Sequence, residues 1–183
     1  MNRRALLLAL LAVPIAVRGT ARAQGDDGWE TVVAPDLHCR LEMPKPVTKS
    51  TAAQKEEGNA SPRLAWESKR ADQIFDFDYV DYKPGWFSDR DTKAMAKALG
   101  RGDAEKAFPT NKFKYVRDEP VTLQGWDGYA LDIEGKDGDL VMMRTYIVKD
   151  RLYRLLATAR SDMRTRSAAT RFIESLRLAE TRP

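Results

Sequence analysis

The sequence predicts an α+β fold: a single domain with an antiparallel β-sheet, a meander of about 6–8 strands, covered by two helices. Three observations indicate this fold. Apolar and polar side chains alternate along many short segments, glycine-containing turns separate those segments, and only a few stretches have helical periodicity. Each alternating strand presents one apolar face, and the helices are needed to cover it.

Four strands are expected in the first half of the domain. Residues 29–33 and 37–43 form the first two, and the second alternates strictly between apolar and polar side chains. Residues 47–62 are polar and are predicted to be a loop, with or without a weak strand. Residues 63–70 and 73–82 are predicted to form a hairpin, because aromatic side chains alternate with aspartates in its second arm.

A helical insertion is expected after this hairpin. Residues 89–99 place apolar side chains on one stripe, which predicts a helix, and Gly100 is expected to cap its C-terminus. A second, short helical turn is predicted at 104–108, because Pro109 would stop it.

The second half of the domain is expected to be a meander of four long strands followed by a helix. Turn sequences such as Gly135-Lys136-Asp137-Gly138 separate the strands and favour hairpins. An apolar stripe that includes Phe172 and Ile173 predicts the helix. The predicted strands are residues 114–123, 129–134, 140–148 and 152–160, the helix is 162–176, and a short strand at 177–179 follows.

The N-terminus has the features of a cleavable signal peptide spanning residues 1–23. Two arginines precede an apolar stretch, 5–17, which has the length of a signal core and is too short to span a bilayer. Ala21-Arg22-Ala23 is a small-x-small cleavage site, so we expect the mature domain to be residues 24–183. A retained membrane anchor is the less favoured alternative. We therefore expect a periplasmic or secreted bacterial protein with no transmembrane segment after cleavage, exported by the general secretory or the twin-arginine route.

The positive net charge of the chain comes from the predicted signal peptide. The chain has 31 Lys and Arg against 27 Asp and Glu, and four of the arginines lie in residues 1–23. The expected mature chain therefore has 27 basic and 27 acidic residues. This balance argues against nucleic acid as a partner. Cys39 is the single cysteine, so an intramolecular disulfide is excluded.

Catalytic and metal-binding motifs are not predicted. His38 is the only histidine, and Cys39 points to the opposite face of the predicted strand, so the two cannot act as base and nucleophile or supply a zinc site. We therefore expect no catalytic residues, no metal and no cofactor. The alternative is a hydrolase-type enzyme with a carboxylate site around Asp76 and Asp78, which share one strand face. The favoured interpretation of these aspartates is a solvated strand face, or one paired with arginines.

Charge is segregated along the expected mature chain. Residues 141–183 contain ten basic and four acidic residues, which leaves a net charge of −6 on residues 24–140. Arginine dominates the basic part, and it suits bidentate contacts with carboxylate or phosphate groups. One interpretation is an anionic partner, with Arg154, Arg160 and Arg164 as candidate contacts. The other is that the basic and acidic parts pair within the fold.

Aromatic residues on turns are further candidates for binding a partner. Trp86 and Phe87 follow a Pro-Gly turn, and Trp126 lies between two glycines. Such residues are either anchors for a partner or lids on the core, and the sequence leaves both open. The predicted function is a non-catalytic periplasmic binding or accessory module. Its expected partner is an anionic envelope component or another periplasmic protein.

Four segments, in order, resemble a widespread group of exported bacterial proteins of uncharacterised function. They are FDFDYVDYKPG (75–85), LQGWDGYALDIEG (123–135), RTYIVKDRLYRLLA (144–157) and RFIESLRL (171–178). Two positions depart from the group's pattern: Asp127-Gly128-Tyr129 replaces its usual Gly-Arg-Glu, and Leu176 replaces its usual phenylalanine. The resemblance implies the fold and the exported location, and the architecture is similar to the PsbP-like fold. It implies no catalytic residue.

The exported protein is expected to begin at Gln24, because signal peptidases cleave after a small-x-small motif. Intact-mass measurement of the protein recovered from the periplasm of a bacterial host checks this. Loss of residues 1–23 supports the prediction, and a retained N-terminus contradicts it.

Overall fold

The computed structural model describes residues 27–52, 60–108, 113–180 and 182. The predicted signal peptide at 1–23 and residues 53–59 of the predicted loop lie outside these ranges. Among the described residues, no helix is both long enough and apolar enough to cross a membrane.

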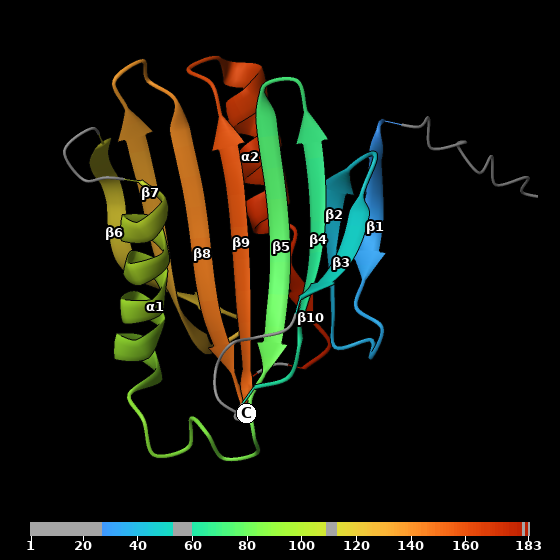
Figure 1. Ribbon diagram of the computed structural model, residues 1–183, viewed down its shortest axis with the longest axis vertical. Coiled ribbons are helices and arrows are strands. Elements are labelled where there is room, and N and C mark those ends of the chain that lie inside the picture. The colour runs from blue at the N-terminus through green and yellow to red at the C-terminus, as the bar shows by residue number, and fades with distance from the viewer. Residues whose placement is uncertain (1–26, 53–59, 109–112, 181, 183) are drawn as a thin grey trace, which may run out of the picture.

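Within the described residues, seven antiparallel strands form a large sheet with the order β3-β4-β5-β9-β8-β7-β6 (Figure 1). The β4–β5 hairpin joins the later meander through the pairing of β5 with β9. A small sheet has the order β1-β2-β10. The strands are β1 (Trp29–Val33), β2 (Cys39–Pro44), β3 (Thr48–Ala52), β4 (Arg63–Arg70), β5 (Gln73–Asp81), β6 (Phe113–Leu123), β7 (Trp126–Gly135), β8 (Leu140–Val148), β9 (Arg151–Ala159) and β10 (Arg177–Leu178).

The helices α1 (Thr92–Ala107) and α2 (Met163–Glu174) cover opposite faces of the large sheet (Figure 1). α1 packs on β7 and β8, whereas α2 packs mainly on β9 and also contacts β2 of the small sheet. An aspartate caps each helix: Asp91 accepts a hydrogen bond from the Ala94 amide, and Asp162 accepts one from the Thr165 amide. Both caps satisfy backbone donors that the helix itself leaves unpaired.

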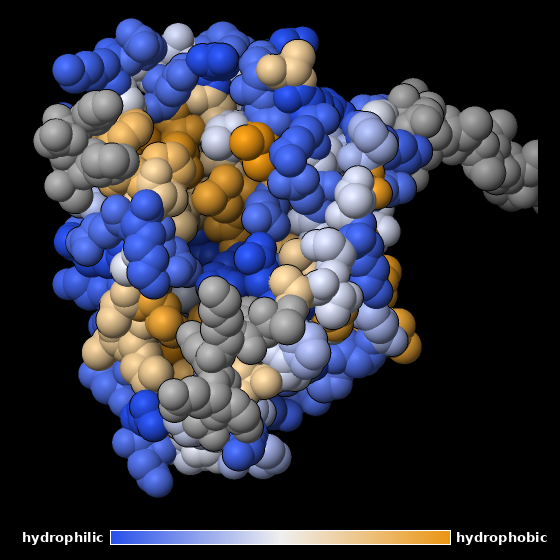
Figure 2. Space-filling model, in the orientation of Figure 1, coloured by the Kyte–Doolittle hydropathy of each residue, from blue (hydrophilic) through white to orange (hydrophobic). Residues whose placement is uncertain are grey.

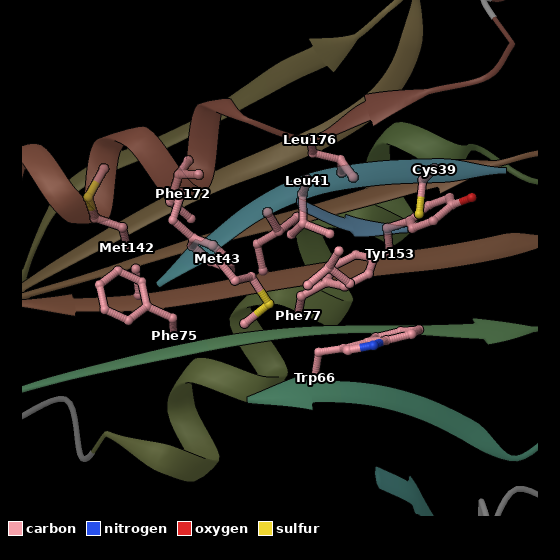
Figure 3. Close-up of a cluster of buried hydrophobic side chains, with 14 of the residues drawn as sticks. Cys39, Leu41, Met43, Trp66, Phe75, Phe77, Met142, Tyr153, Phe172 and Leu176 are labelled. Atoms are coloured by element: carbon pink, nitrogen blue, oxygen red, sulfur yellow. The ribbon is translucent and has the colours of Figure 1, made fainter. Parts of the chain in front are cut away.

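The main hydrophobic core lies between the large sheet on one side and α2 with the small sheet on the other. Phe75 and Phe77 of β5, Leu41 and Met43 of β2, and Phe172 of α2 meet there, and all five are at most 1 % exposed (Figure 3). Each fully buried side chain of this size contributes roughly 1.5–3 kcal/mol to folding. A second core lies under α1 on the opposite face of the sheet.

The predicted α+β class, with an antiparallel sheet and helices on it, is confirmed. The strands expected at 29–33, 63–70 and 140–148 have those bounds, and the other predicted strands differ only at their ends. The weak strand that the loop prediction for 47–62 allowed is β3, an exposed edge strand. The two-sheet arrangement was not predicted.

The predicted end of the first helix at Gly100 was wrong, because α1 continues to Ala107. Gly100 is buried, and a Cβ atom there would lie 3.2 Å from Oγ1 of Thr145 on β8. The glycine therefore permits close approach of the helix to the sheet and does not terminate the helix. The short turn predicted at 104–108 is the last turn of the same helix.

Gly128→Ala is expected to destabilise the fold. An added Cβ would lie 2.2 Å from Cδ1 of Tyr146 and 2.8 Å from the carbonyl oxygen of Thr145. Overpacking of this kind typically costs about 1–3 kcal/mol. The matched control is Gly102→Ala in α1, where a Cβ meets nothing within 4 Å, so alanine is expected to raise stability by roughly 0.5–1 kcal/mol. Denaturant unfolding measures both, and an unchanged midpoint for Gly128→Ala would contradict this packing.

Candidate functional site

Two of the aromatic residues singled out from the sequence, Phe87 and Trp126, line one cleft of about 400 Å³ at the end of the large sheet where β5 ends and β7 begins. We call it the aromatic cleft. Its lining residues are Phe87, Ser88, Arg90, Thr92, Trp126, Asp127, Ile147, Lys149, Asp150 and Arg182.

The β8–β9 turn holds one wall of the aromatic cleft in place. The carboxylate of Asp150 accepts hydrogen bonds from the backbone amides of Gly85 at 2.9 Å and Phe87 at 3.5 Å. Phe87 is only 3 % exposed and packs edge to face on Tyr82, with a centroid distance of 5.0 Å. Phe87 is therefore mainly a lid on the second core, and Asp150 fixes the loop that carries it.

Trp126 forms the opposite wall of the aromatic cleft, at the first residue of β7. The guanidinium of Arg182 lies over its ring at 5.7 Å and donates to the Asp127 carboxylate at 3.2 Å. The same carboxylate accepts a hydrogen bond from the Thr92 hydroxyl at 2.6 Å, which ties the start of α1 to β7. Asp127 is thus engaged by the protein's own donors.

Three basic side chains and two carboxylates line the aromatic cleft, so the cleft has an excess of positive charge. Lys149 is exposed and pairs with Glu180. Arg90 has no ion-pair partner among the described residues, and its guanidinium stacks at 4.5 Å over the ring of Trp86. Trp86 itself lies outside the lining and stacks on Tyr82, so its contribution is to hold Arg90 at the rim.

Arg154 lies away from the aromatic cleft, in an ion-pair network on the sheet face that carries α1. It donates to Asp78 at 2.9 Å and to Asp103 of α1 at 3.2 Å. Arg63 of β4 pairs with the same Asp78 at 3.1 Å and with Asp76 at 3.4 Å. Figure 2 shows strongly hydrophilic residues in the middle of this face. The arginine-paired interpretation of the aspartates is therefore correct, and Asp78, at 5 % exposed, is not solvated.

Burial and the neighbouring Asp78 carboxylate raise the pKa of Asp76 to about 6. Glu67 stands directly opposite Asp76 in the β4–β5 register, which adds like-charge repulsion. Burial also raises the pKa of Asp78, although Arg154 and Arg63 oppose that shift. The network therefore holds more negative charge than its two arginines balance.

Arg160 and Arg164 lie at the opposite end of the molecule from the aromatic cleft. Arg160 follows the last residue of β9, a strand that runs roughly 26 Å from Arg151. It pairs with Asp139 at 2.7 Å, and Arg164 is 87 % exposed and 4.0 Å from Asp72. The structure thus separates the three candidate arginines from the aromatic candidates.

The carboxylate-site enzyme is not supported by this geometry. Arginines hold both Asp76 and Asp78. His38 lines a pocket with Asp81 and Asp150, which contains neither Asp76 nor Asp78. In the ranges that the structure describes, no three His, Cys, Asp or Glu side chains come together as a metal site. Cys39 is buried, and burial raises the pKa of its thiol to about 12.

Arg90, Lys149 and Arg182 of the aromatic cleft were not among the predicted contacts. The excess of basic residues in 141–183 predicted an anion-binding region there, and Arg90 lies outside that part of the chain. The available signal was local: Arg90 follows Trp86 by four residues and directly precedes the helix cap Asp91.

Asp76→Asn is expected to stabilise the protein at pH 7.5 by about 1 kcal/mol. The pKa of Asp76 is raised in the folded state, so its charged form disfavours folding above that pKa, and the penalty vanishes as the pH falls to 4. Denaturant unfolding at pH 7.5 and 4.5 measures the difference between variant and parent, with Asp137→Asn in an exposed turn as control. A gain that is equal at both pH values, or absent at both, contradicts this account.

The comparison with solved structures supports the fold alone. No family model and no curated protein matches the chain. Cyanobacterial PsbP (CyanoP) from Synechocystis matches with a TM-score of 0.54 and 8 % identity over 88 % of this chain and 98 % of that one. LpqN of Mycobacterium tuberculosis, described as involved in cell envelope biogenesis, matches with a TM-score of 0.46 and 16 % identity over 83 % and 91 % of the two chains. PA94 of Pseudomonas aeruginosa has a TM-score of 0.43 and 13 % identity over 85 % and 98 %. The chain has a PsbP-like fold.

Proposed function

We propose that the protein is a non-catalytic binding or accessory module of the cell envelope, and that its aromatic cleft holds an anionic group of a partner. The proposal rests on which charged groups of the cleft are already paired within the protein. Both carboxylates are engaged by donors of the protein itself, while Arg90 has no ion pair among the described residues.

The geometry around Arg90 favours an anion as the bound group. Stacking on Trp86 fixes the plane of the guanidinium and leaves its edge for bidentate hydrogen bonds to carboxylate or phosphate. Lys149 and Arg182 add charge on the opposite side of the cleft. Thr92, the first residue of α1, also lines the cleft, although the Asp91 carboxylate already caps that end of the helix.

A non-catalytic role is supported by the hydrogen bonds that the two cleft carboxylates already accept within the protein. Asp150 holds the backbone of the 85–87 turn, and Asp127 links Thr92 to Arg182. A general base must reach a proton on the substrate, and neither carboxylate is available for that without breaking these bonds. The envelope location rests on the predicted signal peptide.

Binding of small anionic probes tests the proposed function. The exported protein is titrated with glucose 1-phosphate, a galacturonate trimer and neutral maltotriose, and the Trp126 indole and Arg90 amide resonances are followed by NMR. We expect shifts with the two anions and none with maltotriose. Arg90→Gln is expected to weaken anion binding about tenfold or more, because hydrogen bonds to charged groups contribute roughly 1.5–3 kcal/mol.

The matched control is Arg160→Gln, which removes an exposed arginine at the other end of β9. It should bind the anions as the parent does. The proposal fails if maltotriose binds equally well, or if Arg90→Gln and Arg160→Gln behave alike.

A further inference from the structure

A second hollow, of about 390 Å³, lies between the β1–β2 turn and the C-terminal segment. We call it the amphipathic hollow. Its lining contains two arginines and no carboxylate, and the rest is mostly apolar. The lining residues are Val33, Leu37, Cys39, Arg40, Gln124, Arg177, Leu178 and Ala179. None of them belongs to the aromatic cleft.

Two exposed apolar side chains stand at the rim of the amphipathic hollow. Leu37 is 72 % exposed and Val33 is 48 % exposed, and they are two of the five large hydrophobic residues with exposed side chains in the described part of the chain. The other three lie on β5, on β6 and at the start of α2. Leu37 closes the β1–β2 turn by donating its backbone amide to the Ala34 carbonyl oxygen at 2.9 Å, and Figure 1 shows this turn at one end of the small sheet.

Leu37 also has an unusual backbone conformation. Its φ is +61°, in the left-handed region that glycine and asparagine enter readily and that bulky side chains rarely adopt. The position therefore carries backbone strain and also exposes a large apolar side chain to water. A strained position of this kind is a candidate for a functional role, and here it carries an apolar side chain that is 72 % exposed.

The arginines of the amphipathic hollow form no ion pair among the described residues, although both also line an adjoining pocket that contains Glu42 and Glu174. Arg40 is exposed on β2 and has no ion-pair partner among the described residues. Arg177 donates to the carbonyl oxygens of Glu174 at 2.6 Å and Leu176 at 2.8 Å, which orients its guanidinium without cancelling its charge. On the adjoining surface, the carboxylate of Glu42 is already paired with an arginine of α2.

We infer that this end of the protein docks on an anionic lipid surface, with Leu37 and Val33 entering the headgroup boundary and Arg40 and Arg177 contacting lipid phosphates. Two exposed apolar side chains flanked by two cations match the order of layers in a bilayer surface, where acyl chains lie beneath anionic headgroups. A free phosphate would use the arginines but would leave the exposed leucine unexplained. Because the inserted apolar area is small, the association is weak and reversible. The inference is independent of the function proposed for the aromatic cleft.

Co-sedimentation with vesicles tests the inference. The exported protein, with its N-terminus established by mass, is mixed with vesicles of phosphatidylcholine alone or with added phosphatidylglycerol. We expect binding to the anionic vesicles only, with a decrease as salt is raised. Arg40→Gln is expected to lower the partition coefficient about fivefold, the effect of one basic side chain near an anionic surface.

Leu37→Asn separates loss of docking from loss of folding. Asparagine tolerates the left-handed backbone, so the variant is expected to melt at a higher temperature than the parent, while vesicle binding falls about tenfold. The matched control is Met163→Gln, which removes an 83 % exposed apolar side chain at the start of α2, the other end of the molecule. This control should bind vesicles as the parent does.

Three results would overturn the inference. One is equal binding to neutral and anionic vesicles or to none, and another is parental vesicle binding by both Leu37→Asn and Arg40→Gln. The third is a Leu37→Asn variant that loses self-association in sedimentation but keeps vesicle binding, which would make the hollow an interface between two copies. Arg90→Gln should leave vesicle binding unchanged, so the failure of this inference and that of the aromatic cleft are distinguishable.

Discussion

The large sheet has two faces, and every strand in it must divide its side chains between them. The face toward α2 is covered twice, by that helix and by the small sheet, so it accepts the large aromatics of β5. The face toward α1 is covered by the helix mainly over β7 and β8. On the remaining strands of that face, Asp78 and Arg154 are paired across neighbouring strands. Buried charge is not confined to that face, because Arg144 of β8 and Asp132 of β7 also form a buried ion pair, on the strand face that carries Met142 and Tyr146 of the main core.

The charge segregation in the sequence is largely internal. Arg151 donates to Asp36 and Asp81, and these bonds raise its pKa although burial works against its charge. Arg154 and Arg171 likewise pair with acidic residues from the first half of the chain. Because removing one member of a buried pair leaves an uncompensated charge, such contacts hold the two halves together. Two of the arginines proposed to contact a partner, Arg40 and Arg90, come from the acidic part of the chain, residues 24–140, which its net charge does not suggest as a binding region.

Local patterns predicted the elements well, and contacts between distant residues account for the misses. Alternation along 73–82 and turn glycines located most strands, because both depend on neighbours in sequence. Gly100 was misread because a glycine that ends a helix and one that lets a helix approach a sheet look alike without knowledge of Thr145. The small sheet depends on β10 pairing with β2 across the length of the chain. The aromatic cleft likewise joins Trp126 to a loop some forty residues earlier, and only the aromatic half of it was anticipated.

Cys39 lies where the small sheet meets the large one, with its side chain against Tyr153 (Figure 3). It is 2 % exposed and is the single thiol of the chain. A thiol this deeply buried reacts with a reagent only when the structure around it opens, since the thiolate is the reactive form and burial suppresses it. The rate of labelling therefore reports the frequency of that opening in the native protein, without an introduced probe. Local opening around the small sheet can thus be followed as a rate in the unaltered chain.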